Sequence, residues 1–222
     1  MKQLRPDVWR LAEFPLPGIN IYLAGDVLID AGRTWDRRRI LKQTKHLKLS
    51  ELALTHVHPD HQGAAKAVCE ERGIPLSCHV DDVEAMEGKR PVQEAASANI
   101  INRVIKAVWE GPPHPVDRAF AEGDDVAGFR VIHAPGHARG EVIFWREEDR
   151  TAICGDVIRN MSYATGRAGI REPPEIFTYD VAENRRSIRK LADLRPALVL
   201  PGHGPEVTDT EELLRFADSL PA

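Results

Sequence analysis

The sequence contains few cysteines and no long hydrophobic run, and these two absences narrow the classes of protein that it can encode. The three cysteines, Cys69, Cys78 and Cys154, suit neither a disulfide framework nor a paired cysteine metal site. We interpret them as reduced, buried packing side chains, as in cytosolic proteins. No apolar run approaches membrane-spanning length, and residues 1–11 lack the apolar core of a signal peptide. We therefore expect a soluble, cytoplasmic protein with no membrane partner.

An excess of positive charge is also absent. Lys and Arg number 30 against 34 Asp and Glu, so the formal net charge is -4. A protein without a basic field has little attraction for nucleic acid, and we expect no nucleic-acid partner. The 222 residues, of which 42% are hydrophobic, are enough for one sizeable core. We expect a single domain over residues 1–222; nothing in the sequence indicates its oligomeric state.

Hydrophobic periodicity predicts alternating strands and helices in both halves of the chain. The expected strands are 19–23, 27–29, 52–55, 74–78, 129–134, 142–145, 151–154 and 197–200, and the expected helices are 35–47, 64–72 and 181–194. Residues 157–179 form a looser stretch. Residues 80–120 resemble a helical insertion, with helices at 82–86 and 95–108, which either borders a site or completes the core. Two strand-rich halves with helices outside predict an α/β fold, a four-layer αββα sandwich.

The pattern H-x-H-x-D-H, which begins at His56, directly follows one of the predicted strands. Side chains two residues apart point about 200° apart on a helix but the same way along an extended chain. His56 and His58 can therefore share one metal if the backbone is extended, and Pro59 favours that conformation at His58. Asp60 and His61 follow and can face a second metal. The motif is predicted to form a loop between a strand and a helix, where chemistry is commonly located.

Three loops in the second half each place one good ligand after an apolar strand. These ligands are His137, Asp156 and His203. With the four residues of the motif they supply seven nitrogen and oxygen ligands, enough for two metals with open positions. Imidazole and carboxylate ligands make Zn²⁺ the leading candidate, with Fe and Mn as alternatives.

With these motifs, and with N-I-Y-L at 20–23, D-A-G at 30–32 and P-G-H-G at 201–204, the sequence resembles the metallo-β-lactamase-fold superfamily of metallohydrolases. The resemblance covers nearly the whole chain. It implies that His56, His58 and His137 hold a first metal. It also implies that Asp60, His61 and His203 hold a second, and that Asp156 bridges the two. Because true β-lactamases lack this bridging carboxylate, the resemblance is to other branches of the superfamily.

Two divalent ions lower the pKa of water to about 7, which provides a hydroxide nucleophile at neutral pH. The resemblance implies that Asp60 is the catalytic residue that orients this nucleophile and later protonates the leaving group. We expect Thr55, Asp30 and Gly202 to set the geometry of the ligand loops. Candidate residues of the substrate pocket follow strands or lie close after Asp156; they are His79, Arg159, Asn160 and Tyr163.

The resemblance favours hydrolysis of a small acyl substrate, which is a thioester, as in glyoxalase II-like hydrolases, or a lactone or other ester. Glutathione specificity is not implied. The chain ends soon after His203, without the glutathione-binding helical domain, and A-R-G follows His137 where glyoxalase II has T-P-G. Three alternatives remain: a persulfide-dioxygenase-like enzyme with one iron held by His56, His137 and Asp156, a phosphodiesterase, and a non-catalytic metal-binding protein.

Overall fold

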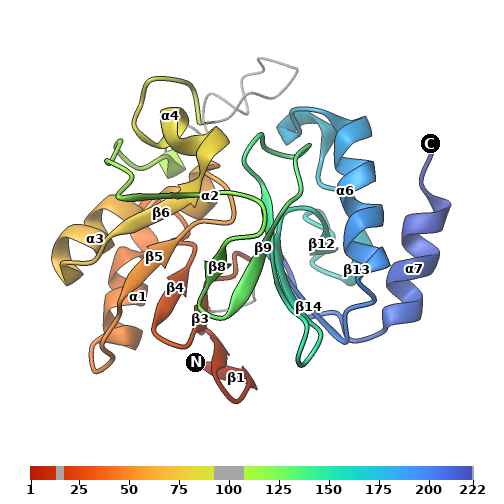
Figure 1. Cartoon of the computed structure of the whole chain (residues 1–222), viewed down its shortest axis with the longest axis horizontal. Coiled ribbons are helices and arrows are strands. Elements are labelled where there is room, and N and C mark those ends of the chain that lie inside the picture. Colours follow the sequence, from red (N-terminus) through yellow and green to blue (C-terminus); the bar gives the residue numbers. More distant parts are fainter. Residues whose placement is uncertain (14–17, 93–107, 222) are drawn as a thin grey trace.

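A seven-stranded sheet is formed by the first half of the chain in the computed structural model, which describes residues 1–13, 18–92 and 108–221 (Figure 1). Strands β1 to β4 pair with one another in antiparallel fashion, whereas β4 to β7 run parallel to one another. The strands, in spatial and chain order, are β1 (Lys2–Arg5), β2 (Val8–Arg10), β3 (Tyr22–Ala24), β4 (Val27–Ile29), β5 (Glu51–Ala53), β6 (Leu76–His79) and β7 (Arg118–Phe120).

A five-stranded sheet is formed by the second half, in the order β14-β11-β10-β9-β8. Strand β14 runs parallel to β11, and the other neighbours are antiparallel. Its strands are β8 (Asp125–Val126), β9 (Phe129–His133), β10 (Val142–Arg146), β11 (Thr151–Gly155) and β14 (Leu198–Pro201). A separate antiparallel hairpin consists of β12 (Arg159–Met161) and β13 (Ala168–Arg171).

Helices cover the outer face of each sheet (Figure 1). Those associated with the first sheet are α1 (Arg37–Thr44), α2 (Pro59–Gln62), α3 (Ala65–Arg72) and α4 (Val83–Met86), with 3-10 turns η1 (Thr34–Asp36) and η2 (Val80–Asp82). Those on the second sheet are α6 (Val181–Asp193) and α7 (Thr210–Ser219); η3 (Glu175–Phe177) precedes them. Asp180 and Asp209 are the N-cap residues of α6 and α7, and the side chain of each accepts a backbone N–H from the first turn of its helix.

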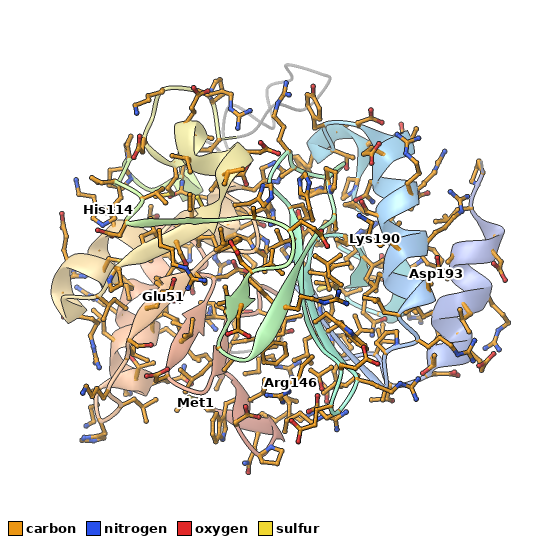
Figure 2. The ribbon with its side chains drawn as sticks, in the orientation of Figure 1. Met1, Glu51, His114, Arg146, Lys190 and Asp193 are labelled. Carbon is orange, nitrogen blue, oxygen red and sulfur yellow. The ribbon has the colours of Figure 1, made fainter. Side chains whose placement is uncertain are left out.

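The helix α6 shows how sequence pattern determines this packing. Ile188 and Leu191 are buried against the sheet, whereas Lys190 and Asp193 on the opposite face are exposed (Figure 2). A 13-residue amphipathic helix of this kind is stable mainly because its apolar face is covered.

Three buried apolar clusters separate the four layers. One lies between the first sheet and α1, α3 and α4, and another between the second sheet and α6 and α7. The third joins the inner faces of the two sheets, where Phe120 of β7 meets Phe144 of β10 edge to face with ring centroids 5.7 Å apart. The predicted αββα sandwich is therefore confirmed.

Several predicted boundaries differ from the structure. The helix predicted at 35–47 begins with η1 and continues as α1 only to Thr44, whose hydroxyl donates back to the Ile40 carbonyl. The loose stretch 157–179 contains the β12–β13 hairpin, and short strands at 2–5 and 8–10 were not predicted because polar residues obscure their alternation. Within the region expected to be a helical insertion, η2 and α4 are helical, but 118–120 is strand β7. Most of the helix expected at 95–108 lies outside the described residues.

Across the described parts of the chain, every helix is too short or too polar to cross a lipid bilayer.

Phe144 provides a test of the core between the sheets. Phe144→Ala should lower the free energy of unfolding by about 3–5 kcal/mol, because the cavity it leaves between two sheets cannot collapse completely. Val80→Ala, at an exposed position, is the control and should change it by less than about 0.5 kcal/mol. Urea denaturation of both variants measures the difference, and a Phe144→Ala variant as stable as the control would contradict the assignment of this core.

Candidate metal centre

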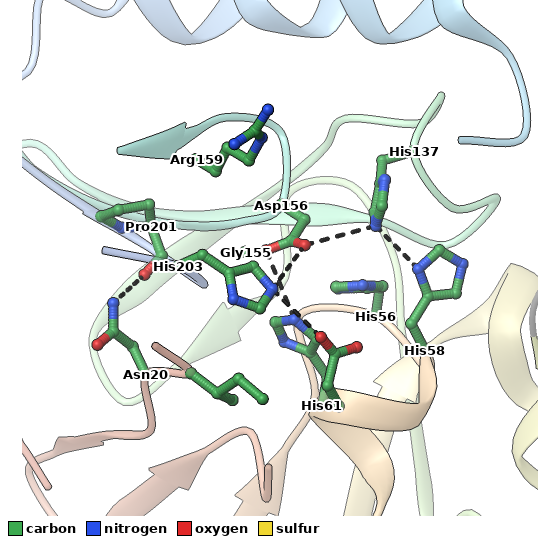
Figure 3. A network of polar contacts seen from close by, with 12 residues as sticks. Asn20, His56, His58, His61, His137, Gly155, Asp156, Arg159, Pro201 and His203 are labelled. Carbon is green, nitrogen blue, oxygen red and sulfur yellow. Dashed lines mark hydrogen bonds and ion pairs between the residues drawn. The ribbon is translucent and has the colours of Figure 1, made fainter. Parts of the chain in front are cut away.

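Polar side chains collect at one edge of the sandwich, where strands β5, β9, β11 and β14 end (Figure 3). The motif leaves β5 as an extended loop and enters α2 at Pro59, the first residue of that helix. His58 has φ -62 and ψ 158, so the predicted extended conformation before the proline is confirmed. Asp60 and His61 lie within this short helix.

One group of imidazoles consists of His56, His58 and His137. One ring nitrogen of each lies within 4.8 Å of the others. His58 turns its Nδ1 towards the group, 2.8 Å from Nε2 of His137, although the two residues belong to loops of different sheets. The predicted members of the first metal site therefore lie together.

A second group consists of Asp60, His61 and His203, again with ligand atoms within 4.8 Å. Nε2 of His203 lies 3.2 Å from Oδ2 of Asp60. Asp156 lies between the two groups: its Oδ2 is 3.1 Å from His203 Nε2 and 3.6 Å from His137 Nε2. Its Oδ1 is 3.5 Å from Nε2 of His61 (Figure 3). All seven predicted ligands thus occupy one site, and Asp156 has the central position expected of a bridging group.

The donor atoms of this site fit divalent metal ions. Nε2 of His56 is buried and has no hydrogen-bond partner among the described residues; Nε2 of His61 and Oδ1 of Asp156 are also buried, and apart from their 3.5 Å charge contact with each other they form no hydrogen bond there. Buried polar atoms without partners are costly and uncommon, so a group of them directed at one place indicates a ligand. Imidazole and carboxylate donors together suit zinc, iron or manganese.

The rear nitrogens of the imidazoles have oxygen partners. Nδ1 of His61 lies 2.9 Å from Oδ2 of Asp30, and Nδ1 of His203 lies 2.6 Å from the Gly18 carbonyl. Such contacts fix the orientation of an imidazole and leave its other nitrogen for a metal. Asp30 also accepts the backbone N–H of Thr55 at 2.8 Å, so these two residues set the loop geometry as predicted.

Glu141 and Thr178 complete this outer set, and neither residue was predicted from the sequence. Oε2 of Glu141 lies 3.3 Å from Nδ1 of His56, and its Oε1 accepts the backbone N–H of Asp156 at 2.9 Å. The Thr178 hydroxyl lies 3.4 Å from Nδ1 of His137. The one signal for Glu141 in the sequence is its charge next to the apolar run 142–145, at a position that the structure buries completely.

Gly202 is required by the close approach of two ligands. A Cβ atom at this position would lie 2.2 Å from Oδ1 of Asp156 and 2.7 Å from Cε1 of His61. No side chain can be accommodated there without moving Asp156, which explains why glycine precedes His203.

Protonation differs among the imidazoles. Burial lowers the pKa of His56 and His58 well below the usual value and that of His137 to about 4, so these rings are neutral and can donate lone pairs. Burial opposes the charge of His61 and His203 as well, but neighbouring carboxylates raise the pKa of both.

The carboxylates of the site are ionised. Burial opposes the charge of Asp60, but its hydrogen bond with His203 and the charges of His61 and His203 lower its pKa to about 2. The same imidazoles lower the pKa of Asp156 well below its usual value. The site therefore presents negative oxygen donors at neutral pH, as cation binding requires.

A cavity of about 260 Å³ opens beside the ligand atoms, and His58, Asp60, His137, Asp156 and His203 form part of its wall. The other described residues of the wall are largely apolar; they are Ile19, Pro59, Trp109, Met161, Tyr163 and Phe177, together with Gly18 and Arg33. The Arg33 guanidinium is paired with Glu13 and Asp36, which neutralise much of its charge. A small, mostly apolar ligand fits such a cavity.

Of the four residues predicted for the substrate pocket, Tyr163 lines this cavity and the other three are not among its described lining residues. Arg159 donates to the carbonyls of Glu172 and Met161. Asn160 bonds the Pro205 carbonyl and the Gly169 N–H. Arg159 thus joins the two strands of the β12–β13 hairpin, whereas Asn160 holds that hairpin against the loop that carries His203.

His79 lies instead against His133, with the rings nearly parallel and their centroids 4.1 Å apart. Asp81 adds a carboxylate, so the three could in principle hold an ion. The lone pairs of parallel rings do not converge, however, and Nε2 of His133 lies 2.8 Å from the Arg139 carbonyl, a hydrogen-bond partner. We interpret this cluster as structural.

A model of the metallo-beta-lactamase superfamily matches residues 16–203. The chain belongs to this superfamily, as its sequence and fold indicated. Probable metallo-hydrolase YflN of Bacillus subtilis (strain 168) is 28% identical over 201 residues, which are 82% of this chain and 76% of that protein.

Two further relatives bear on chemistry. The crystal structure of TTHA1623 in a di-iron-bound form is 31% identical, with a TM-score of 0.67, and the match covers 93% of this chain and 97% of that one. Atrochrysone carboxyl ACP thioesterase of Aspergillus fumigatus is 24% identical over 212 residues, which are 90% of this chain and 55% of that protein.

The buried His79 should make the metal-free protein less stable in acid. Burial, followed by the charge of His133, lowers the pKa of His79 to about 4, whereas in an unfolded chain it is about 6.5. Between these values the unfolded chain binds a proton that the folded chain does not, so stability falls as the pH falls through this range. His79→Gln should therefore lose less stability than the wild type on acidification.

Urea denaturation of the metal-free proteins at several pH values tests this difference. His46→Gln, at an exposed position, is the control and should follow the wild-type profile. If the His79→Gln profile ran parallel to that of the wild type, His79 would not be the group that titrates.

Proposed function

We propose that this protein is a hydrolase that uses two divalent metal ions to cleave a small acyl substrate, which is a thioester, a lactone or another ester. His56, His58 and His137 hold one ion, Asp60, His61 and His203 hold the other, and Asp156 bridges them. The observation that supports this most strongly is the set of buried, unpartnered nitrogen and oxygen atoms at the wall of a small apolar cavity.

When bound, the ions supply Lewis acidity, which makes water a nucleophile near neutral pH and polarises an acyl carbonyl. Asp60 is the catalytic residue. Its ionised carboxylate lies at the cavity wall and is held by His203, so it can orient the attacking water, take up its proton and return that proton to the leaving group.

Tyr163 is the proposed hydrogen-bond donor to the acyl oxygen of the substrate. Its ring stands edge-on to His203, with centroids 5.3 Å apart, at the cavity wall. Tyr163 is 47% exposed overall, but partial desolvation at the cavity wall, followed by the charges of Asp156 and Asp60, raises the pKa of its hydroxyl, which keeps its proton. A protonated phenol in this position can donate a hydrogen bond to the oxyanion that forms on the substrate.

Two observations support an acyl substrate: the apolar cavity wall, and the relative from Aspergillus fumigatus that is named as a thioesterase. Zn²⁺ is the ion that the ligand types favour, and the di-iron-bound relative gives specific support for iron. Iron also suits the second candidate, an iron-dependent persulfide dioxygenase in which His56, His137 and Asp156 hold a single ion.

The deciding experiment is metal quantification on protein purified without added metal, combined with turnover assays on thioesters, lactones, phosphodiesters and persulfides. We expect about two ions per chain and turnover of an acyl substrate. One iron per chain with oxygen uptake on persulfide would replace the proposal with the dioxygenase, and phosphodiester cleavage would assign the chain to that class. Fewer than one ion per chain would contradict a dinuclear site.

His58→Ala should abolish turnover and lose about one ion per chain, because it removes a nitrogen from the first group. Metal analysis and activity are measured on the same preparation. His46→Ala, at an exposed position, is the matched control and should keep both ions. Full activity of His58→Ala with its metal content intact would show that the first group does not hold an ion.

Asp60→Asn should keep the fold but lower kcat by about 100-fold or more, because an amide can neither accept the proton of the attacking water nor return it. Circular dichroism verifies folding, and metal content is measured alongside kcat. Asp124→Asn, a carboxylate in an exposed turn, should leave kcat unchanged. Wild-type turnover by Asp60→Asn would exclude Asp60 as the proton carrier.

A further inference from the structure

Asp82 occupies the N-cap position of α4, but its side chain does not cap that helix. An aspartate at this position usually accepts a backbone N–H from the first turn of the helix, which stabilises that turn. Here the carboxylate is 2% exposed and forms its hydrogen bonds with other parts of the chain. The side chain of Asp82 therefore has a role outside its own helix.

The two oxygens of Asp82 bind two loops. Oδ2 accepts the backbone N–H of Val57 at 3.2 Å, and Oδ1 accepts that of Gly140 at 3.0 Å. Val57 stands between His56 and His58, and Gly140 lies in the loop that carries His137. One side chain therefore joins the loops that carry the three members of the first imidazole group, although those loops come from different sheets.

The contact between Gly140 and Asp82 requires that residue 140 has no side chain. A Cβ atom there would lie 2.5 Å from Cγ of Asp82 and 2.8 Å from its Oδ1. Any other residue would force the carboxylate away from the loop. The absence of a side chain at Gly140 and the missing cap at α4 are independent observations that indicate the same role.

We propose that Asp82 is a positioning residue for the first metal ion: it holds the loops of His58 and His137 so that Nδ1 of one and Nε2 of the other stay 2.8 Å apart. This rests on the proposed function, since it requires that the site binds metal. Asp82 contacts no ligand side chain of the second group. His61 and His203 are held by Asp30 and by the Gly18 carbonyl instead.

Because Asp82 holds the loops of the first imidazole group and not the ligands of the second, its substitution should weaken metal binding selectively at the first site. Asp82→Asn keeps one acceptor oxygen but turns an N–H₂ group towards one of the two backbone N–H groups, so one of the loops is released. Loss of an outer partner typically weakens metal binding by about 10–100-fold. We expect a loss of about tenfold or more at the first site and of less than about threefold at the second.

The two sites are separated with single-site backgrounds. The His203→Ala variant lacks a ligand of the second site and keeps those of the first. The His137→Ala variant lacks a ligand of the first site and keeps those of the second. Asp82→Asn is placed in each background, and the dissociation constant of Zn²⁺ is measured by chelator competition. The expected result is weaker binding in the His203→Ala background alone. Equal weakening in both backgrounds, or none, overturns the proposal.

Two further variants serve as a control and as a second test of this proposal. Asp117→Asn is the matched control, because Oδ2 of Asp117 accepts the Leu76 N–H at 2.9 Å, at the opposite end of β6 from Asp82. It should change neither constant. Gly140→Ala should reproduce the selective loss, and it serves as the test if Asp82→Asn does not fold. If the wild type itself binds no Zn²⁺, the proposed function is wrong. If the wild type binds two ions, and neither Asp82→Asn nor Gly140→Ala changes the dissociation constant of the first site, only the inference about Asp82 is wrong.

Discussion

The contact of one buried carboxylate with several imidazoles determines the arrangement of the site. Asp156 leaves β11 and lies within 3.6 Å of ring nitrogens on His61, His137 and His203. Histidines crowded together in a dry interior destabilise any positive charge among them, and Asp156 supplies the opposite charge. The neighbouring features serve to hold this carboxylate: Glu141 binds its backbone N–H, and Gly202 leaves room for its oxygen.

Much of the fold and of the ligand set could be predicted from the sequence, because each ligand directly follows an apolar strand. Such strands are short and buried, so the chain must leave the sheet at the next polar residue. His137 and His203 illustrate this: each lies in the loop that begins where β9 or β14 stops. The proline after His58 likewise predicted the local backbone, since its effect depends on nearest neighbours alone.

The outer partners could not be predicted, because their roles depend on which loops meet in space. Glu141 and Thr178 belong to no motif, and a backbone carbonyl such as that of Gly18 has no signature in any sequence. Asp82 would be interpreted as a helix cap from the sequence, and the fold directs it elsewhere. Arg159 shows the converse: its nearness to Asp156 in sequence suggested the pocket, whereas in the fold its guanidinium binds backbone carbonyls and lies over the ring of Tyr163, which lines the cavity.

The meeting of His58 with His137 joins points 79 residues apart in the chain. An ion shared by them would act as a cross-link between the two sheets, and closing a long loop restricts an unfolded chain more than closing a short one. This cross-link differs from a covalent one because a chelator removes it without altering any residue. The free energy of unfolding would then depend on the concentration of metal. A protein without its ions would unfold more readily, in addition to being inactive.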